Sequence, residues 1–314
     1  MRNKLILYLS FALIVVMSLT ACGQEVEQSS GEGKLKVVAT TTIVGDVVAQ
    51  VGGDNIVLSV LLPIGTDPHG FDPTPRDVAK VAEADVVFAN GAGLEAFLDN
   101  LIESAGADDK VVYVSEGVDF LVFEGGDQHE EDGEGHLLEA VDPHTWLDPN
   151  NVTVWVHNIE HQLREADTEN AEIYTTNAGK YEAKLGDLDA WIREQVALIP
   201  EENRELVTDH TLFSYFAEAY GFEQIGALIP GYSSLSEPTA QDLAKIEDAI
   251  MDLGVKAVFV GNTVNPSLAE RVVEDTGTKL VFVYTGSLSD PRGEAGTYIE
   301  YIRYNTNAFV DALK

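Results

Sequence analysis

Short apolar runs alternate with helix-typical segments along the first part of the sequence, and this alternation constrains the fold more than any other feature. Each run is long enough for one buried strand, and Gly, Pro or polar residues separate it from the next segment. Strands are predicted at 35–40, 56–62, 86–89 and 111–114, with helices at 43–51, from 74 onward and at 94–104. Strands that alternate with helices predict a parallel β-sheet covered by helices, an α/β fold.

The second half of the chain repeats this pattern. Residues 73–81 and 238–246 are identical at five of nine positions, and each segment precedes a predicted helix and then a short apolar strand. Strands are predicted at 206–209, 224–229, 257–260 and 279–283, with helices at 212–220, 241–251, 266–275 and 297–313. We therefore expect two similar parallel-sheet α/β lobes, 35–150 and 201–314.

Residues 151–200 predict two helices that connect the lobes. The second of them runs from 167 or 168 to about 198, and its apolar residues recur at spacings of three and four. These residues are Ile173, Tyr181, Leu185, Leu188, Ile192, Val196 and Ile199. At 1.5 Å per residue this long interlobe helix spans about 45 Å. We expect it to pack on both lobes and to limit their relative motion.

The first 21 residues have the layout of a secretory signal. Arg2 and Lys4 precede an apolar run at 5–17, which is too short to favour a membrane span, although a membrane anchor is the alternative. The segment resembles a bacterial lipoprotein signal, which implies lipidation of Cys22. Residues 22–34 then form a flexible tether. Because Cys22 is the only cysteine, an intrachain disulfide and a cysteine metal cluster are both excluded.

The chain is strongly acidic, with a formal net charge of −34. Nucleic acid is therefore not an expected partner. Residues 119–141 form an acidic loop in which His129 and His136 lie among eight carboxylates. This loop is either a weak collector of cations, and so a possible accessory metal site, or an ordinary acidic surface loop.

Three of the seven histidines follow predicted strands. His69 lies in the loop after the second strand, His144 follows the fourth, and His210 ends the first strand of the second lobe. Ligands of open α/β sheets collect beyond the carboxyl ends of the strands, so these side chains could converge. Asp290, in the loop after the last strand, is the fourth candidate. Three imidazoles and a carboxylate suit a divalent transition metal.

Two other histidines, His157 and His161, are four residues apart on a predicted helix and could chelate a metal. We expect them to face solvent instead, because the apolar residues of that helix fall on a different face. Trp146 and Tyr232 are expected to pack around the ligand site rather than to ligate.

Three segments resemble the zinc/manganese solute-binding proteins of bacterial ABC importers. They are Pro-His-Gly-Phe-Asp-Pro-Thr-Pro-Arg-Asp at 68–77, Asp-Pro-His-Thr-Trp-Leu-Asp-Pro at 142–149 and Thr-Asp-His-Thr-Leu-Phe-Ser-Tyr-Phe-Ala-Glu-Ala-Tyr-Gly at 208–221. The resemblance covers essentially all of the chain after the signal. It implies that His69, His144 and His210 are metal ligands and that Asp290, in a segment that diverges from the family's, is the fourth. It also implies a metal site in the cleft between two α/β lobes joined by a long helix.

The resemblance leaves the metal open between zinc and manganese or iron. A histidine rather than a glutamate at position 210 adds a nitrogen ligand, which favours zinc over the harder manganese ion. Zinc-specific members also often carry a His- and acid-rich insertion where this chain has residues 119–141. Zinc is therefore the expected ligand, and manganese is the alternative.

The expected function is capture rather than catalysis. An extracytoplasmic monomer, held on the outer face of the cell membrane or in the periplasm by the lipid on Cys22, would bind a divalent metal and deliver it to an importer permease. A zinc metallohydrolase is one rival, but His-Glu-x-x-His and Gly-x-Ser-x-Gly are absent. A binding protein for an organic ligand and a metal-dependent adhesin are the others.

Overall fold

The computed structural model describes residues 33–122 and 141–314. Cys22, His129 and His136 lie outside these residues. The chain divides into two units, 1–34 and 35–314, and the second of them contains all the helices and strands described below. Within the described residues, no helix combines the length and the apolar character that crossing a membrane requires.

The first lobe is built on a four-stranded parallel sheet with the strand order β2-β1-β3-β4. Its strands are β1 (Leu35–Ala39), β2 (Ile56–Val60), β3 (Val86–Ala89) and β4 (Val111–Tyr113), and its helices are α2 (Thr42–Gly52), α3 (Pro75–Glu83) and α4 (Leu98–Ala105). Alternate residues of β3 face opposite sides of the sheet. Val86 and Phe88 pack with α2, whereas Val87 and Ala89 pack with α3 and α4. Both faces are therefore covered, which explains why β3 is uniformly apolar.

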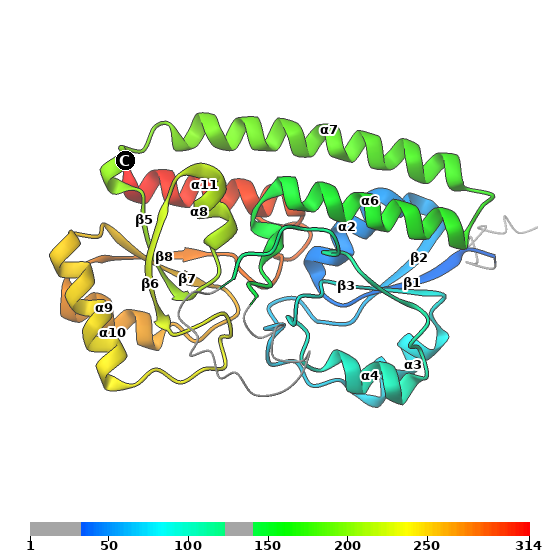
Figure 1. Ribbon diagram of the computed structural model, residues 1–314, viewed down its shortest axis with the longest axis horizontal. Coiled ribbons are helices and arrows are strands. Elements are labelled where there is room, and N and C mark those ends of the chain that lie inside the picture. Colours follow the sequence, from blue (N-terminus) through cyan, green and yellow to red (C-terminus); the bar gives the residue numbers. More distant parts are fainter. Residues whose placement is uncertain (1–32, 123–140) are drawn as a thin grey trace, which may run out of the picture. The chain divides into compact units, whose positions relative to one another are not determined.

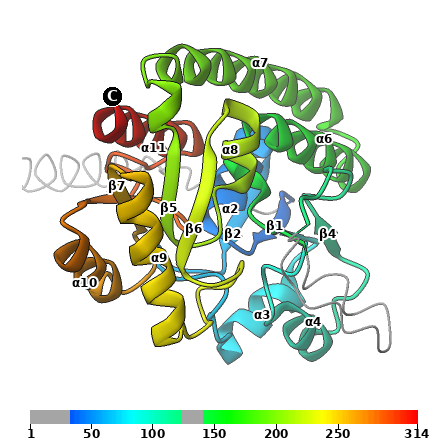
Figure 2. The same ribbon diagram turned by 60° about the vertical axis from the view of Figure 1, so that its left-hand side comes forward.

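The second lobe repeats this topology, with the strand order β6-β5-β7-β8. Its strands are β5 (Glu205–His210), β6 (Glu223–Ile229), β7 (Ala257–Gly261) and β8 (Lys279–Val283), and its helices are α8 (Ser214–Tyr220), α9 (Ala240–Leu253), α10 (Ser267–Thr276) and α11 (Tyr298–Leu313). Figure 2 shows α9 and α10 on one face of this sheet and α11 on the other. Val258 and Val260 pack with α9 and α10, and Phe259 packs against Phe309 of α11. The expectation of two similar α/β lobes is confirmed.

Two helices, α6 (Pro149–Ala166) and α7 (Ala171–Val196), connect the lobes. Figure 1 shows α7 running above both, and it contacts α2 and α6 on one side and α8 and α11 on the other. The expected apolar face of α7 is buried from Tyr181 to Val196, but at its beginning Tyr174 takes the place predicted for Ile173, whose side chain is exposed. One continuous hydrophobic cluster runs from β1 through α7 to α11.

Hydrogen bonds also join the two lobes directly. The backbone N–H of Leu288 donates to the hydroxyl of Thr42 at 2.9 Å, and that of Gly65 donates to the hydroxyl of Ser287 at 2.8 Å. The N–H of Tyr298, in the first turn of α11, donates to the Asp46 carboxylate on α2 at 2.9 Å. The lobes are therefore held together by polar contacts as well as by the shared core.

Candidate metal centre

The three predicted histidines reach one point from different parts of the fold. His69 lies in the loop after β2, His144 immediately precedes a 3-10 turn at Thr145–Leu147, and His210 is the last residue of β5. The loop of His144 is fixed by two long-range bonds. The Asn90 side chain donates to the carbonyl of Pro143 at 3.0 Å, and the Tyr215 hydroxyl donates to the carbonyl of Asp142 at 2.8 Å.

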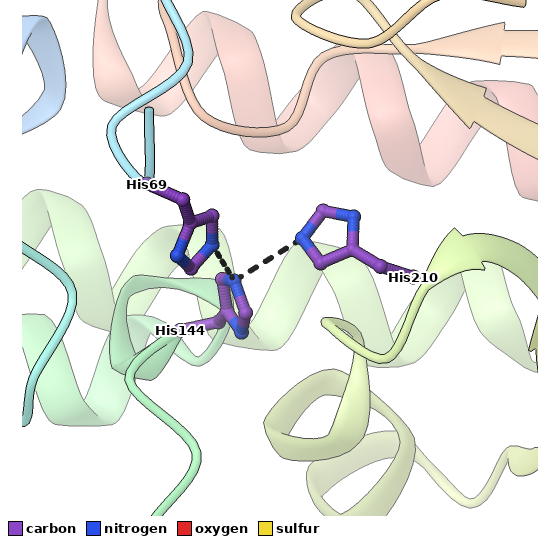
Figure 3. A group of neighbouring side chains, drawn as sticks. All are labelled: His69, His144 and His210. Atoms are coloured by element: carbon purple, nitrogen blue, oxygen red, sulfur yellow. Dashed lines mark hydrogen bonds between the residues drawn. The ribbon is translucent and has the colours of Figure 1, made fainter. Parts of the chain in front are cut away.

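The imidazoles present their Nε2 atoms to one another, as Figure 3 shows. Nε2 of His144 lies 3.2 Å from Nε2 of His69 and 3.4 Å from Nε2 of His210. One ligand atom from each residue lies within 4.8 Å of the others. A tetrahedral ion with metal–nitrogen bonds of about 2.0–2.1 Å separates its ligand atoms by about 3.3–3.4 Å. The spacing therefore suits one transition-metal ion held by three nitrogens.

A carboxylate orients two of the three rings. Oδ1 of Asp142 lies 2.7 Å from Nδ1 of His144, and Oδ1 of Asp209 lies 2.5 Å from Nδ1 of His210. A carboxylate at this distance keeps the proton on Nδ1, which leaves Nε2 unprotonated as an electron-pair donor. Each carboxylate also accepts the backbone N–H of its own histidine, at 2.9 Å for Asp142 and 2.7 Å for Asp209. These contacts fix the positions of the two rings and favour the tautomer whose Nε2 can ligate.

Burial keeps two of the imidazoles, those of His69 and His144, neutral. Desolvation, and then the neighbouring His144 and His210, lower the pKa of His69 to about 3. Desolvation and the proximity of His210 hold the pKa of His144 well below its usual value. Burial also raises the pKa of Asp142 to about 7, against the hydrogen bond from the N–H of His144. Because only a neutral imidazole can ligate, His69 and His144 are poised to bind metal at neutral pH.

Trp146 and Tyr232 lie beside the site as predicted. The Trp146 ring meets His144 edge-on at a centroid distance of 5.2 Å, and Tyr232 lies 6.5 Å from His144. The indole N–H of Trp146 donates to the Tyr301 hydroxyl at 3.0 Å, and that hydroxyl donates to the carbonyl of Thr285 at 2.8 Å. This chain of bonds connects the His144 loop with the loop after β8.

The structure does not bring Asp290 to the imidazoles, and its role as a fourth ligand stays a prediction. Its side chain is 68% exposed and lies 3.8 Å from the guanidinium of Arg292. The physical reason is a tight turn after Pro291, in which the N–H of Gly293 donates to the Asp290 carbonyl at 2.7 Å and that of Arg292 to its carboxylate at 3.1 Å. In this arrangement the side chain of Asp290 stabilises the local turn.

His157 and His161 face solvent, as expected, with side chains 62% and 71% exposed. The sequence reasoning missed Asp142 and Asp209 as partners of the site. A signal for them was present, because each of the three ligand candidates has an aspartate one or two residues before it, at positions 67, 142 and 209. Asp67 follows the same rule, with Oδ1 accepting the N–H of His69 at 3.0 Å.

Two parallel-sheet lobes, a connecting helix and imidazoles converging from both lobes define the metal-binding class of solute-binding proteins. Residues 37–312 match the family described as "Zinc-uptake complex component A periplasmic", and the chain belongs to this family. It is thus a metal-binding component of an ABC importer, located outside the cytoplasm, and not an enzyme.

Individual relatives align with this chain over nearly its full length and nearly their own. The manganese-binding lipoprotein MntA of Halalkalibacterium halodurans is 38% identical over 307 residues, or 97% of each chain. The manganese ABC transporter substrate-binding lipoprotein PsaA of Streptococcus pneumoniae is 33% identical over 98% of this chain and 97% of its own. The structure of the periplasmic zinc-binding protein TroA from Treponema pallidum superposes with a TM-score of 0.79 at 26% identity, covering 90% of this chain and 99% of that one. Relatives therefore carry the names of both metals.

Proposed function

We propose that His69, His144 and His210 capture one divalent transition-metal ion and that the loaded protein delivers it to the permease of an ABC importer. The observation that carries this proposal is the convergence of three Nε2 atoms at 3.2 and 3.4 Å. Burial, and then the repulsion that protonated imidazoles so close together would exert on one another, lower the pKa of His69. Neutral imidazoles at the same distances can instead bind one metal ion together.

Two observations bear on which metal is bound, and they favour different metals. Three nitrogen ligands predict that zinc binds more tightly than manganese, because affinity at a given site rises from manganese towards zinc. The names of the relatives favour manganese, including the one that is 38% identical. We propose that manganese is the metal delivered, and that zinc binds the same site with higher affinity and competes for it. The comparisons do not confirm the expectation of zinc as the native ligand.

The membrane attachment is part of the same proposal. Relatives are named lipoproteins, which supports acylation of Cys22 after removal of residues 1–21. The chain would then act as a monomer tethered beside its permease through residues 22–34. His129 and His136 are proposed as weak accessory ligands in the acidic loop. A further role in adhesion would use the same metal site and stays a prediction.

Competitive calorimetry with the mature chain, residues 22–314 carrying Cys22→Ser, tests the proposal. We expect one zinc or manganese ion per chain and a large loss of affinity in His210→Ala. His157→Ala is the matched control, because it removes an exposed imidazole, and it should bind as the parent does. Equal losses in the two variants would refute the assignment. Metal analysis of the protein isolated from its own cells would identify the cargo.

A further inference from the structure

A cavity in the first lobe lies outside the candidate metal centre. Its volume is about 370 Å³, which is within the range of small-molecule pockets. Its walls are the loop after β3, the first turn of α4, the end of β4 and the segment that follows β4. None of the proposed metal ligands lines it. The cavity is therefore a separate feature, at the side of the sheet where β4 is the edge strand.

Two aromatic side chains give the cavity an apolar wall. Tyr113, the last residue of β4, is 41% exposed, and Phe120 is 39% exposed. The buried Leu98 of α4 lines the cavity as well. At Gly91 a Cβ would come within 3.1 Å of Cβ of Tyr113, so the missing side chain lets the tyrosine pack directly on this loop. The two rings present apolar area that a ligand can cover.

Every charged side chain among the described residues that line this cavity is acidic. Asp99 and Glu116 are exposed, and Glu95 is buried. Residues 111–163 contain no Lys or Arg. Burial, and then the negative charges of Asp99 and Glu95, raise the pKa of the Tyr113 hydroxyl. The same negative potential favours a cation beside the ring, because a cleft with charges of one sign concentrates their field.

The loop beside these groups has an unusual backbone. Ala92, which lines the cavity, has a φ of 53° and is the only described residue other than glycine with a positive φ. This conformation is uncommon for a residue with a Cβ, and such strain is concentrated at functional sites. The buried carboxylate of Glu95 holds the loop, because it accepts the N–H groups of Asn90 and Gly91 at 2.7 and 3.0 Å. This wall of the cavity is therefore formed without a ligand.

We propose that this cavity binds a small organic ammonium ion with an apolar body, such as an arylalkyl amine. The body would cover the rings of Tyr113 and Phe120, and the ammonium group would lie near the carboxylates of Asp99 and Glu116. A cation beside an aromatic face gains electrostatic energy in addition to the buried apolar area. The described carboxylates of the cavity do not converge as metal ligands do, so an apolar cation fits it better than a metal ion.

A ligand-observed NMR titration of the mature chain, residues 22–314 with Cys22→Ser, tests the proposal. The probe is 2-phenylethylammonium, and 2-phenylethanol and 3-phenylpropionate have the same ring and linker with a neutral or a negative end. We expect saturable binding of the ammonium ion, weaker binding of the alcohol and no binding of the carboxylate. This comparison uses only the parent protein, so it stands even where a variant fails to fold.

Two variants locate the site. Tyr113→Leu removes the ring but keeps an apolar side chain, and Asp99→Asn combined with Glu116→Gln removes two charges. We expect each change to weaken binding of 2-phenylethylammonium by about three- to tenfold, because exposed cation–π contacts and exposed ion pairs each contribute modestly. Thermal melts of the same samples confirm that the variants are folded.

The matched controls lie elsewhere on the surface. Phe282→Leu changes an exposed aromatic residue of the other edge strand, β8, and Asp187→Asn combined with Glu194→Gln removes two exposed charges from α7. Both should bind the amine as the parent does. Equal binding of the three probes, no saturable binding, or variants that match their controls would overturn the proposal. Tighter binding of Nα-acetyl-lysine amide than of the amine would also overturn it, since the cavity would then suit a protein side chain.

Discussion

The backbone N–H of Leu288, in the second lobe, donates a 2.9 Å hydrogen bond to the side-chain hydroxyl of Thr42 in the first. The same hydroxyl lies 3.3 Å from the Ser287 hydroxyl, which in turn accepts the N–H of Gly65. A side chain at the start of α2 thus helps to fix the loop that follows β8. This relationship can be tested without touching any proposed metal ligand.

Replacing Thr42 by Val keeps the shape of the side chain but removes the hydroxyl. The N–H of Leu288 then loses its partner, so the free energy of unfolding should fall by about 1–3 kcal/mol. Urea unfolding of the metal-free protein measures this change. Thr175→Val is the control, because its hydroxyl bonds Glu160 on an exposed surface, and there the change should be small. Equal unfolding energies in the two variants would show that the lobe contact contributes little.

Asp209 should matter for metal binding although it is not a proposed ligand. Asp209→Asn removes the negative charge beside Nδ1 of His210, and outer carboxylates of this kind change metal affinity by about 10–100-fold. We expect weaker binding in calorimetry, with Asp311→Asn, an exposed residue at the end of α11, as the unchanged control. An unaltered affinity would mean that the ring of His210 is oriented by other contacts. Thermal melts of the metal-free protein show whether the lost bond to the N–H of Gly261 also lowers stability.

In the metal-free protein, the fall of stability with acid should depend in part on the protonation of His69. Its pKa is about 3 in the folded protein against 6.5 normally, so between these values the unfolded chain binds one proton more. The stability that neutral His69 contributes is therefore complete above pH 6.5 and lost as pH falls towards 3. His69→Gln should flatten the decline of melting temperature with acid. The raised pKa of Asp142 acts in the opposite direction, but it is present in both proteins and should largely cancel in their difference.

His161→Gln serves as the control for this titration, because the His161 side chain is 71% exposed and lies 3.7 Å from Glu165. Its melting temperature should follow pH as the parent's does. A His69→Gln variant with the parent's full acid dependence would show that His69 is not responsible. Metal release by acid follows from the same chemistry, because protons compete with the metal for the imidazole nitrogens.

Two glycines give a matched test of packing, one beside the partner of His210 and one on α7. A Cβ at Gly261 would come within 2.1 Å of Thr285 Oγ1, whereas a Cβ at Gly179 in α7 meets nothing within 4 Å. Gly261→Ala should therefore lower the free energy of unfolding by about 1–3 kcal/mol and disturb Thr285, which lies beside the three imidazoles. Gly179→Ala should raise it by about 0.5–1 kcal/mol, because alanine favours the helix. Denaturant unfolding compares the two, and changes of the same sign would contradict this account.

The strands and their order of appearance could be predicted from the sequence because buried parallel strands are continuous apolar runs. The first residues of the helices were harder to predict, since hydrogen bonds of side chains decide where a helix begins. The helix expected at 94–104 begins only at Leu98, because the buried carboxylate of Glu95 accepts the backbone N–H groups of Asn90 and Gly91 in a loop. The predicted extent of the long helix was close to the observed one, but Tyr174 rather than Ile173 faces the core at its start. The domain limits at 150 and 200 stay a prediction.

The convergence of the three histidines was predictable because strand ends in parallel sheets meet at one edge. The direction of Asp290 was not, because it depends on how the turn at Pro291 folds back on itself. The contacts of Asp142 and Asp209 with the histidine rings could not be predicted for a similar reason. Whether an aspartate beside a histidine reaches Nδ1 depends on backbone angles that spacing along the sequence does not specify.

The unbroken hydrophobic cluster from β1 through α7 to α11 has a consequence for how a transporter senses loading. A large hinge rotation of one lobe would disrupt the packing of this cluster. The radius of gyration measured by small-angle scattering should therefore be nearly the same with and without metal. Under the proposed function, the permease would then have to distinguish the two states by the local ordering of the loops that carry the three imidazoles.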